Sequence, residues 1–169
     1  MKIGFLCSDI DIPLFGDEGC SIHVRDFTDA LVDLGHDVFI VCPSLGENTN
    51  MPIKSRLYHV QPRGLDALGW SLVEQEPIIQ TQQLERDLRS VAYNFWLQSE
   101  GASIIKREQP DLLYERYSLF GWGGIQLARR QRIPLEFQPN YDLAYTALST
   151  AMLIRTASQC SRLNRRTGR

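Results

Sequence analysis

The chain has 169 residues, of which 43% are hydrophobic, and it carries a formal net charge of −2. This length and apolar content allow one sizeable core, which favours a single domain. The charge is uneven, because residues 1–142 hold all 20 acidic residues and only 13 of the 18 basic ones. An acidic body argues against a nucleic-acid partner, and five arginines on a terminal tail are most simply solvated.

The chain has four cysteines: Cys7, Cys20, Cys42 and Cys160. They show no C-x-x-C spacing and no histidine cluster, so the sequence predicts neither a metal site nor a structural disulfide. The first apolar run turns polar at Asp9, too soon for a signal peptide or a transmembrane segment. We expect a cytoplasmic protein that needs no metal or other cofactor.

The first elements in chain order are a strand, a helix and a second strand. Ile3 to Cys7 and Val38 to Cys42 are short, continuously apolar runs, as expected of strands covered on both faces. Between them, Ser21 to Leu34 has the periodicity of an amphipathic helix. Gly35 occupies the place of a left-handed cap after that helix, and His36 reads as a cap or packing residue. The inward face of the helix is predicted to hold four residues: Val24, Phe27, Leu31 and Leu34.

Arg56 to Gln61 alternates like a third strand, and residues 62–79 read as a long irregular loop. From Gln80 a long helical pattern follows, in which Gly101 is a possible interruption and the aromatics Phe95 and Trp96 are predicted to lie in the core. Its predicted buried stripe has six residues: Leu84, Leu88, Val91, Phe95, Ala102 and Ile105.

The last elements are a strand over 110–117, a helix over 125–132 and a strand over 133–137. This alternation of strands and helices predicts an α/β fold, a Rossmann-like, doubly wound, mainly parallel sheet flanked by helices. Three glycines before that last helix, at 121, 123 and 124, are expected to let it pack closely on the sheet.

The loop between the first strand and the first helix is the primary candidate site, because open α/β sheets bind ligands at the carboxyl ends of their strands. Gly16 and Gly19 let the backbone approach a ligand, and helix amides there favour an anion, although Asp17 and Glu18 oppose one. The plain alternative is an ordinary strand-to-helix turn. Ser21 is predicted to cap the helix.

Further candidates follow in the helix and at the end of the strand over 110–117. His23 lies one turn into the helix and either reaches a sugar or phosphate oxygen or is a buried, satisfied histidine. Arg116 can donate hydrogen bonds from its planar guanidinium to an acceptor hydroxyl or a phosphate, or else form an ion pair with Glu115 or Asp9. The full substrate-binding set is Gly16, Gly19, Ser21, His23, Tyr114, Glu115 and Arg116, with no metal ligands and no catalytic residue assigned.

Three segments in this order resemble a known family. They are Gly19-Cys-Ser-Ile-His-Val-Arg25, Leu34-Gly-His-Asp-Val38 and Pro110-Asp-Leu-Leu-Tyr-Glu-Arg-Tyr-Ser-Leu-Phe-Gly121. Over residues 2–137 the sequence is similar to the N-terminal lobe of GT-B-fold glycosyltransferases of the retaining, family-four type. The resemblance implies an acceptor-side lobe with a donor diphosphate or acceptor group near the glycine loop. In that family the C-terminal lobe holds most of the nucleotide-sugar, through an Arg, a Lys and a pair of glutamates.

The final stretch departs from this family, because Tyr141 to Arg169 contains one acid and five arginines and offers no donor lobe. We therefore expect an N-terminal glycosyltransferase domain over 1–140 and an atypical basic tail over 141–169. Either the chain is truncated before the donor lobe, or 143–154 is a natural C-terminal helix docked on the sheet.

The expected function is the acceptor-side half of a sugar transfer from a nucleotide-sugar to an acceptor, inactive alone. The alternatives are a non-catalytic binding or interaction module, and one half of a split glycosyltransferase that pairs with a separate donor-lobe chain. An NAD-dependent oxidoreductase is disfavoured, because the glycine loop lacks G-x-G-x-x-G and no acidic residue directly follows the second strand.

Overall fold

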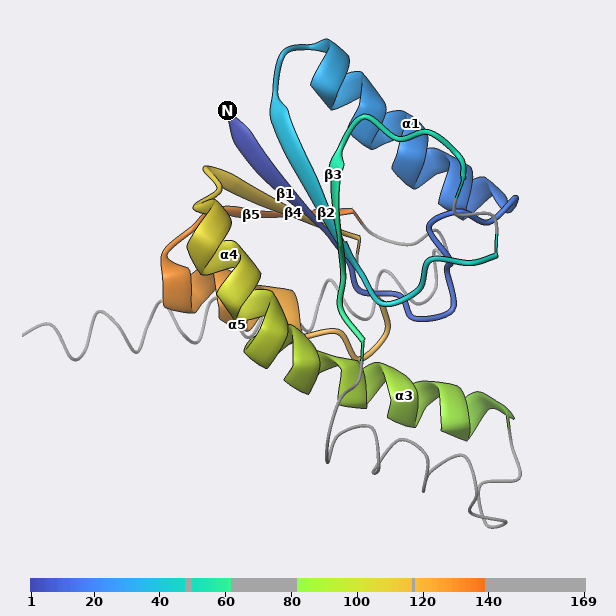
Figure 1. Ribbon diagram of the computed structural model, residues 1–169. Coiled ribbons are helices and arrows are strands. Elements are labelled where there is room, and N and C mark those ends of the chain that lie inside the picture. Colours follow the sequence, from blue (N-terminus) through green and yellow to red (C-terminus); the bar gives the residue numbers. More distant parts are fainter. Residues whose placement is uncertain (48–49, 62–81, 117, 139–169) are drawn as a thin grey trace, which may run out of the picture. The chain divides into compact units, whose positions relative to one another are not determined.

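The computed structural model of the chain describes residues 1–47, 50–61, 82–116 and 118–138. Residues Met1–Gln138 form one compact unit built on a five-stranded parallel sheet (Figure 1). The strands are β1 (Lys2–Cys7), β2 (Asp37–Cys42), β3 (Arg56–His59), β4 (Leu112–Arg116) and β5 (Leu135–Gln138). The helices are α1 (Gly19–Asp33), α3 (Gln82–Trp96), α4 (Ala102–Glu108) and α5 (Gly123–Gln131).

The strand order is β3-β2-β1-β4-β5, which confirms the predicted Rossmann-like, doubly wound sheet. Central β1 pairs with β2 through Phe5 opposite Ile40, and with β4 through Phe5 opposite Tyr114. The order therefore reverses between β1 and β4, and an open sheet of this kind binds ligands at the carboxyl ends of its strands at such a reversal.

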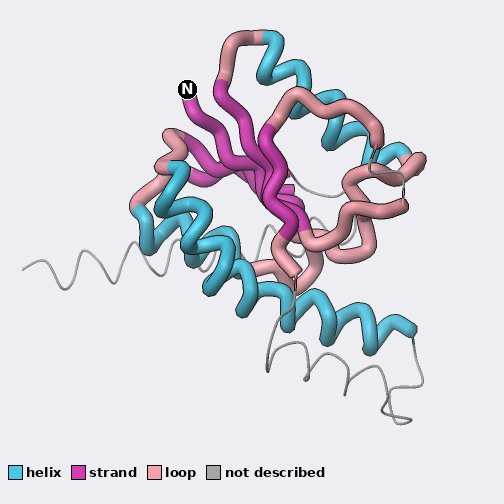
Figure 2. Tube along the Cα trace, in the orientation of Figure 1, coloured by secondary structure: helices cyan, strands magenta, loops and turns pink. Residues whose placement is uncertain are grey.

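Helices cover both faces of the sheet (Figure 2). On one face α1 contributes Val24 and the partly buried Phe27 to a core that includes Phe5 and Ile40. On the other face α3, α4 and α5 pack on Phe39 and other strand residues. Both faces of β1 and β2 are buried, and this is why their sequences are continuously apolar instead of alternating.

Helix α1 differs from its prediction at both ends. It begins at Gly19, and its N-cap is Glu18 in an extended conformation, so the prediction that Ser21 caps the helix is wrong. At the other end Gly35 adopts the expected left-handed conformation, with φ +85°. Leu34 beside it is 74% exposed and does not join the predicted buried stripe.

The predicted long helix is not broken at Gly101. A π-helical turn, Leu97–Gly101, joins α3 to α4 without a gap. Its buried stripe is different from the one predicted. Ser90, Tyr93 and Asn94 face inward, whereas Leu88 and Phe95 are 36% and 57% exposed. The prediction that Phe95 lies in the core is therefore wrong, while the prediction for Trp96, 3% exposed, is confirmed.

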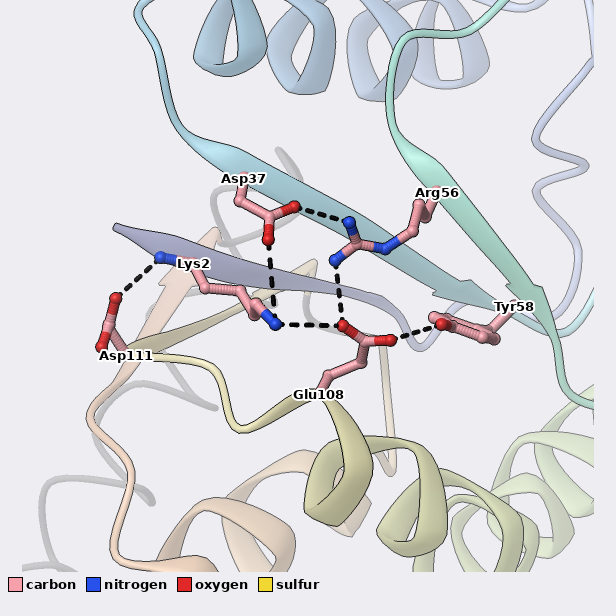
Figure 3. A network of polar contacts seen from close by, with 6 residues as sticks. All are labelled: Lys2, Asp37, Arg56, Tyr58, Glu108 and Asp111. Atoms are coloured by element: carbon pink, nitrogen blue, oxygen red, sulfur yellow. Dashed lines mark hydrogen bonds and ion pairs between the residues drawn. The ribbon is translucent and has the colours of Figure 1, made fainter.

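A network of charged residues lies at the amino-terminal edge of the sheet (Figure 3). This edge is opposite to the carboxyl ends of the strands, where ligands bind in this fold. Arg56 contacts Asp37 at 2.8 Å and Glu108 at 2.9 Å, and Lys2 contacts the same two carboxylates at 3.7 and 3.4 Å. A hydrogen bond from Tyr58, together with the two cations, holds the pKa of Glu108 below its ordinary value. The network links β1, β2 and β3 to the end of α4.

The predicted loop over 62–79 and the basic tail over 141–169 lie outside the described residues. Within the described part of the chain, no helix is both long and apolar enough to cross a membrane.

Candidate functional site

The candidate site lies where the carboxyl ends of β1 and β4 meet. The pairing of these strands continues one step past β1, since the Ser8 amide donates to the Arg116 carbonyl at 3.4 Å. Beyond that point the loop 8–18 follows β1, and the described residues between β4 and α5 are 118–122. The chain therefore leaves β1 and β4 side by side, at the point where the strand order reverses.

The β1–α1 loop is held in place by a side chain of the helix that follows it. The Arg25 guanidinium donates to the Leu14 and Gly16 carbonyls at 2.6 and 2.8 Å. A Cβ on Gly16 would come within 2.8 Å of the Ser21 hydroxyl, so this glycine allows a close approach. Gly19 is different, because no heavy atom lies within 4 Å of its Cβ position. The backbone is therefore open to solvent at Gly19 and closely covered at Gly16.

The first turn of α1 carries no side-chain cap and no acidic residue. Ser21 lies inside the helix and is fully buried, and its hydroxyl has no hydrogen-bond partner among the described residues. The amides of an uncapped first turn carry a partial positive charge and favour an anion. Its exposed neighbours Asp17 and Glu18 supply the only opposing charges of the stretch 12–24.

Arg116 links β4 to this first turn. Its side chain is on the α1 face of the sheet and donates from Nη1 to the Cys20 carbonyl at 2.9 Å. The residue is 8% exposed, and its Nε has no hydrogen-bond partner among the described residues. A buried cation thus lies at the positive end of a helix, an arrangement that an anion would stabilise.

Glu115 points to the opposite face of the sheet and is 1% exposed. Ser8 donates a hydrogen bond to its Oε1 at 2.5 Å, and a Cβ on Gly124 would overlap its carboxylate. Burial raises the pKa of the Glu115 carboxyl to about 7, against the opposing effects of Ser8 and of the Gly124 amide. Glu115 therefore touches the starts of the β1–α1 loop and of α5 instead of opening to solvent.

The other two predicted residues lie on the α1 face. The Tyr114 ring packs between Phe5 and Phe27, with ring centroids 5.4 and 4.8 Å away, and contributes to that core. His23 is exposed, and its Nε2 lies 2.6 Å from Nε2 of Gln138 at the end of β5. Arg116 and His23 thus both lie near the first two turns of α1, on the carboxyl side of the sheet.

The sequence analysis missed Asn94, a buried residue of α3 that organises the β4–α5 loop. Its Oδ1 accepts hydrogen bonds from the amides of Trp122 and Gly123 at 2.7 and 2.6 Å, and its Nδ2 donates to the Phe120 carbonyl at 3.0 Å. Asn94 therefore caps α5 from another helix. The available signal was a single amide among aromatic residues, Tyr93-Asn-Phe-Trp96.

The close packing on the sheet that was predicted for three glycines is confirmed for Gly124 only, since Gly121 lies against the Ser118 backbone of its own loop and Gly123 lies against a helix. A Cβ on Gly123 would meet Leu97 at 3.0 Å, and Gly124 lies against Glu115 on the sheet. No group of three His, Cys, Asp or Glu residues suited to a metal ion occurs among the residues that the structure describes.

Comparisons with known proteins agree with this architecture. No protein with curated annotation matches the sequence. Among solved structures, the SsfS6 glycosyltransferase from Streptomyces sp. SF2575 aligns with a TM-score of 0.51 at 15% identity, over 82% of this chain and 39% of that one. Acinetobacter baumannii MurG aligns at 14% identity with a TM-score of 0.46, over 86% and 38%. The C-terminal domain of a Pyrococcus furiosus hydrogenase, PF1911, also aligns, at 11% identity and a TM-score of 0.46, over 81% of this chain and 89% of that domain.

The chain thus spans about two fifths of the length of the SsfS6 and MurG chains. The model of Glycosyltransferase Family 4 matches residues 18–162, most of the chain, including α1 with Gly19 and the whole of β4. The chain belongs to Glycosyltransferase Family 4, with the fold of an N-terminal GT-B glycosyltransferase lobe.

Proposed function

We propose that this chain is the acceptor-side lobe of a retaining glycosyltransferase, which transfers a sugar from a nucleotide-sugar to an acceptor. The observation that carries the proposal is the family match over residues 18–162. The geometry supports an anion-binding site in this lobe, since the uncapped first turn of α1 and the Arg116 guanidinium meet where the strand order reverses.

In this proposal the first turn of α1 and Arg116 bind an anionic oxygen of the substrates, such as a donor diphosphate. The helix amides contribute partial positive charge, and Arg116 contributes a full one next to them. These groups are fixed before a ligand arrives, because Arg116 is hydrogen-bonded to the Cys20 carbonyl and Arg25 holds the loop. Prearranged charge of this kind stabilises a leaving diphosphate without a metal ion.

Within this scheme Glu115 is a positioning residue, because its carboxyl is 1% exposed. It joins Ser8, where the β1–α1 loop begins, to Gly124 at the start of α5. Gly19 leaves the start of α1 open toward the substrate, Gly16 and the buried Ser21 lie against each other, and His23 lies at the surface.

The test of the anion site is calorimetric titration of the full chain with nucleoside diphosphates and the matching monophosphates. We expect tighter binding of a diphosphate, and a loss of at least tenfold in affinity for Arg116→Met. The matched control is Arg130→Met, since Arg130 is an exposed arginine of α5 that contacts Gln98. Gly19→Val is a second test that leaves packing intact, because its Cβ has open space, and it should weaken binding without lowering the melting temperature. Unchanged affinity in both variants would contradict the anion site.

The proposal also predicts that the 169-residue chain alone does not turn over. Sugar transfer needs donor and acceptor to be held next to each other between two lobes. With one lobe alone the reaction lacks positioning, which lowers the activation free energy by roughly 7 kcal/mol, and charge stabilisation, which lowers it by roughly 3 kcal/mol. The assay follows transfer and donor hydrolysis with a panel of nucleotide-sugars. Turnover by this chain alone would contradict the proposal, and turnover only with a second polypeptide would identify a split enzyme. Ligand binding without turnover under either condition would favour the alternative, a non-catalytic binding module.

A further inference from the structure

An uncharged aromatic surface lies on the side of the sheet covered by α3 and α5. Phe95 of α3 is 57% exposed and Phe120 of the β4–α5 loop is 45% exposed. Trp122 lies in the same loop as Phe120, and its ring is 5.4 Å from that of Phe95 at an interplanar angle of 87°. We call Phe95, Phe120 and Trp122 the aromatic corner. Large apolar groups gathered at a surface mark a binding site more often than single ones do.

The backbone of the loop is strained in a way that keeps Phe120 at the surface. Phe120 has φ +63°, a left-handed conformation that residues with a Cβ rarely adopt. Asn94 maintains it, by donating to the Phe120 carbonyl and accepting from the Trp122 and Gly123 amides. Strain that the surroundings fix in this way is concentrated at functional sites.

The chemistry of the corner selects a neutral, apolar ligand. Residues 118–128 contain no charged side chain, and neither do residues 90–99 of the facing helix. The polar groups of the loop are also used internally, since the Gly121 amide donates to the Ser118 carbonyl and Gln98 donates to the Gly123 carbonyl. The surface thus presents ring faces and edges, which suit another flat ring in stacked or edge-to-face contact.

The position of the corner relates it to the candidate site. Phe120 and Trp122 lie between β4, which ends at Arg116, and α5, which begins at Gly123. We infer that the aromatic corner binds the apolar ring of an aglycone, so that the acceptor of the proposed transfer is a compound whose hydroxyl is carried on or near a flat ring. This inference rests on the proposed function and specifies the substrate class of the same lobe.

The experiment compares phenyl β-glucoside with methyl β-glucoside, which share a sugar and differ in the ring, by ligand-observed NMR titration of the full chain. We expect the phenyl compound to bind at least fivefold more tightly, and the preference to disappear in Phe120→Gly. Glycine accepts a positive φ without strain, so this variant should melt at the same or a higher temperature, and loss of binding then cannot reflect unfolding. Phe95→Ala should reduce the preference too. The control is Leu34→Ala, which removes a still more exposed apolar side chain, 74% exposed, just past the far end of α1.

An absence of preference in the wild type, or a preference that survives both variants, would overturn the inference. Two other occupants have their own signatures. A dimer in light scattering that Phe120→Gly makes monomeric would assign the corner to a second copy of the chain, and co-sedimentation with anionic phospholipid vesicles that this variant abolishes would assign it to a membrane. Nucleoside diphosphate titration keeps the two proposals separate, because failure of the corner leaves diphosphate binding intact, whereas failure of the anion site leaves the ring preference intact.

Discussion

The buried carboxyl of Glu115 makes the stability of this lobe depend on pH in a direction opposite to that of an ordinary salt-bridged acid. Its pKa is raised from 4.5 to about 7 by burial. The folded chain therefore binds more protons than the unfolded chain between these two values. The stabilisation is fully present below pH 4.5, declines as the pH rises and is lost above pH 7.

The magnitude follows from the shift itself. One pKa unit corresponds to about 1.4 kcal/mol, so the difference between 4.5 and about 7 corresponds to at most about 3 kcal/mol of unfolding free energy. Glu115→Gln should remove this dependence, because the amide is neutral at every pH. Its oxygen can accept from the Gly124 amide while its NH2 group donates to the Ser8 hydroxyl. We therefore expect the variant to gain stability relative to the wild type as the pH rises.

The assay is urea denaturation of the wild type and the variant at several pH values from 4.5 to 8. Because the other titrating groups are shared, their effects cancel in the difference between the two proteins, and the remaining slope reports Glu115. Glu108→Gln is the control with the opposite sign, since the pKa of Glu108 is lowered by Tyr58 and by the neighbouring cations. Parallel pH profiles for wild type and Glu115→Gln would refute the reasoning, because they would mean that burial does not suppress ionisation there.

Three further predictions concern packing, loop support and thiol chemistry. Gly124→Ala should lower the unfolding free energy by about 2–3 kcal/mol, because its Cβ would overlap the carboxylate beneath it, whereas Gly19→Ala should have almost no effect; equal melting temperatures would contradict this. Asn94→Ala should cost about 2–3 kcal/mol in chemical denaturation by leaving buried amides unpaired, and a loss below 0.5 kcal/mol would argue against its capping role. Among the described thiols, Cys20 should react with a thiol reagent at pH 8 before Cys42, whose pKa is raised by burial; mass spectrometry of the labelled peptides gives the order.

The strands could be predicted from the sequence because a parallel sheet covered on both faces imposes a local pattern. Ile3 to Cys7 and Val38 to Cys42 are apolar at every position, and each lies within an observed strand. The end of α1 could be predicted from an equally local signal, since the left-handed Gly35 comes just after the last turn. Features of this kind depend on neighbours in sequence, and reading the sequence is sufficient for them.

The buried face of α3 could not be predicted in the same way. Periodicity favoured Leu88 and Phe95 as inward positions, yet Asn94 faces inward because its partners are the amides of Trp122 and Gly123, far along the chain. The prediction of the cap at the start of α1 was wrong for a related reason. Ser21 is a good cap by type, but the chain is already helical at Gly19, and the serine hydroxyl is buried against the loop that Arg25 holds. Long-range polar contacts decided both cases.

Tyr114, Glu115 and Arg116 lie at the carboxyl end of β4, where the sequence analysis expected them, but they do not share one environment. Successive side chains of a strand point to opposite faces, so adjacent residues of β4 have different surroundings. Tyr114 and Arg116 face α1, where one joins the core and the other reaches the Cys20 carbonyl. Glu115 faces α5 and holds Ser8. A single strand end thus directs a cation toward the β1–α1 loop and a titratable carboxyl toward the loop of the aromatic corner. A shift of β4 by one residue would exchange them, and the carboxylate would then oppose the anion that we propose binds at α1.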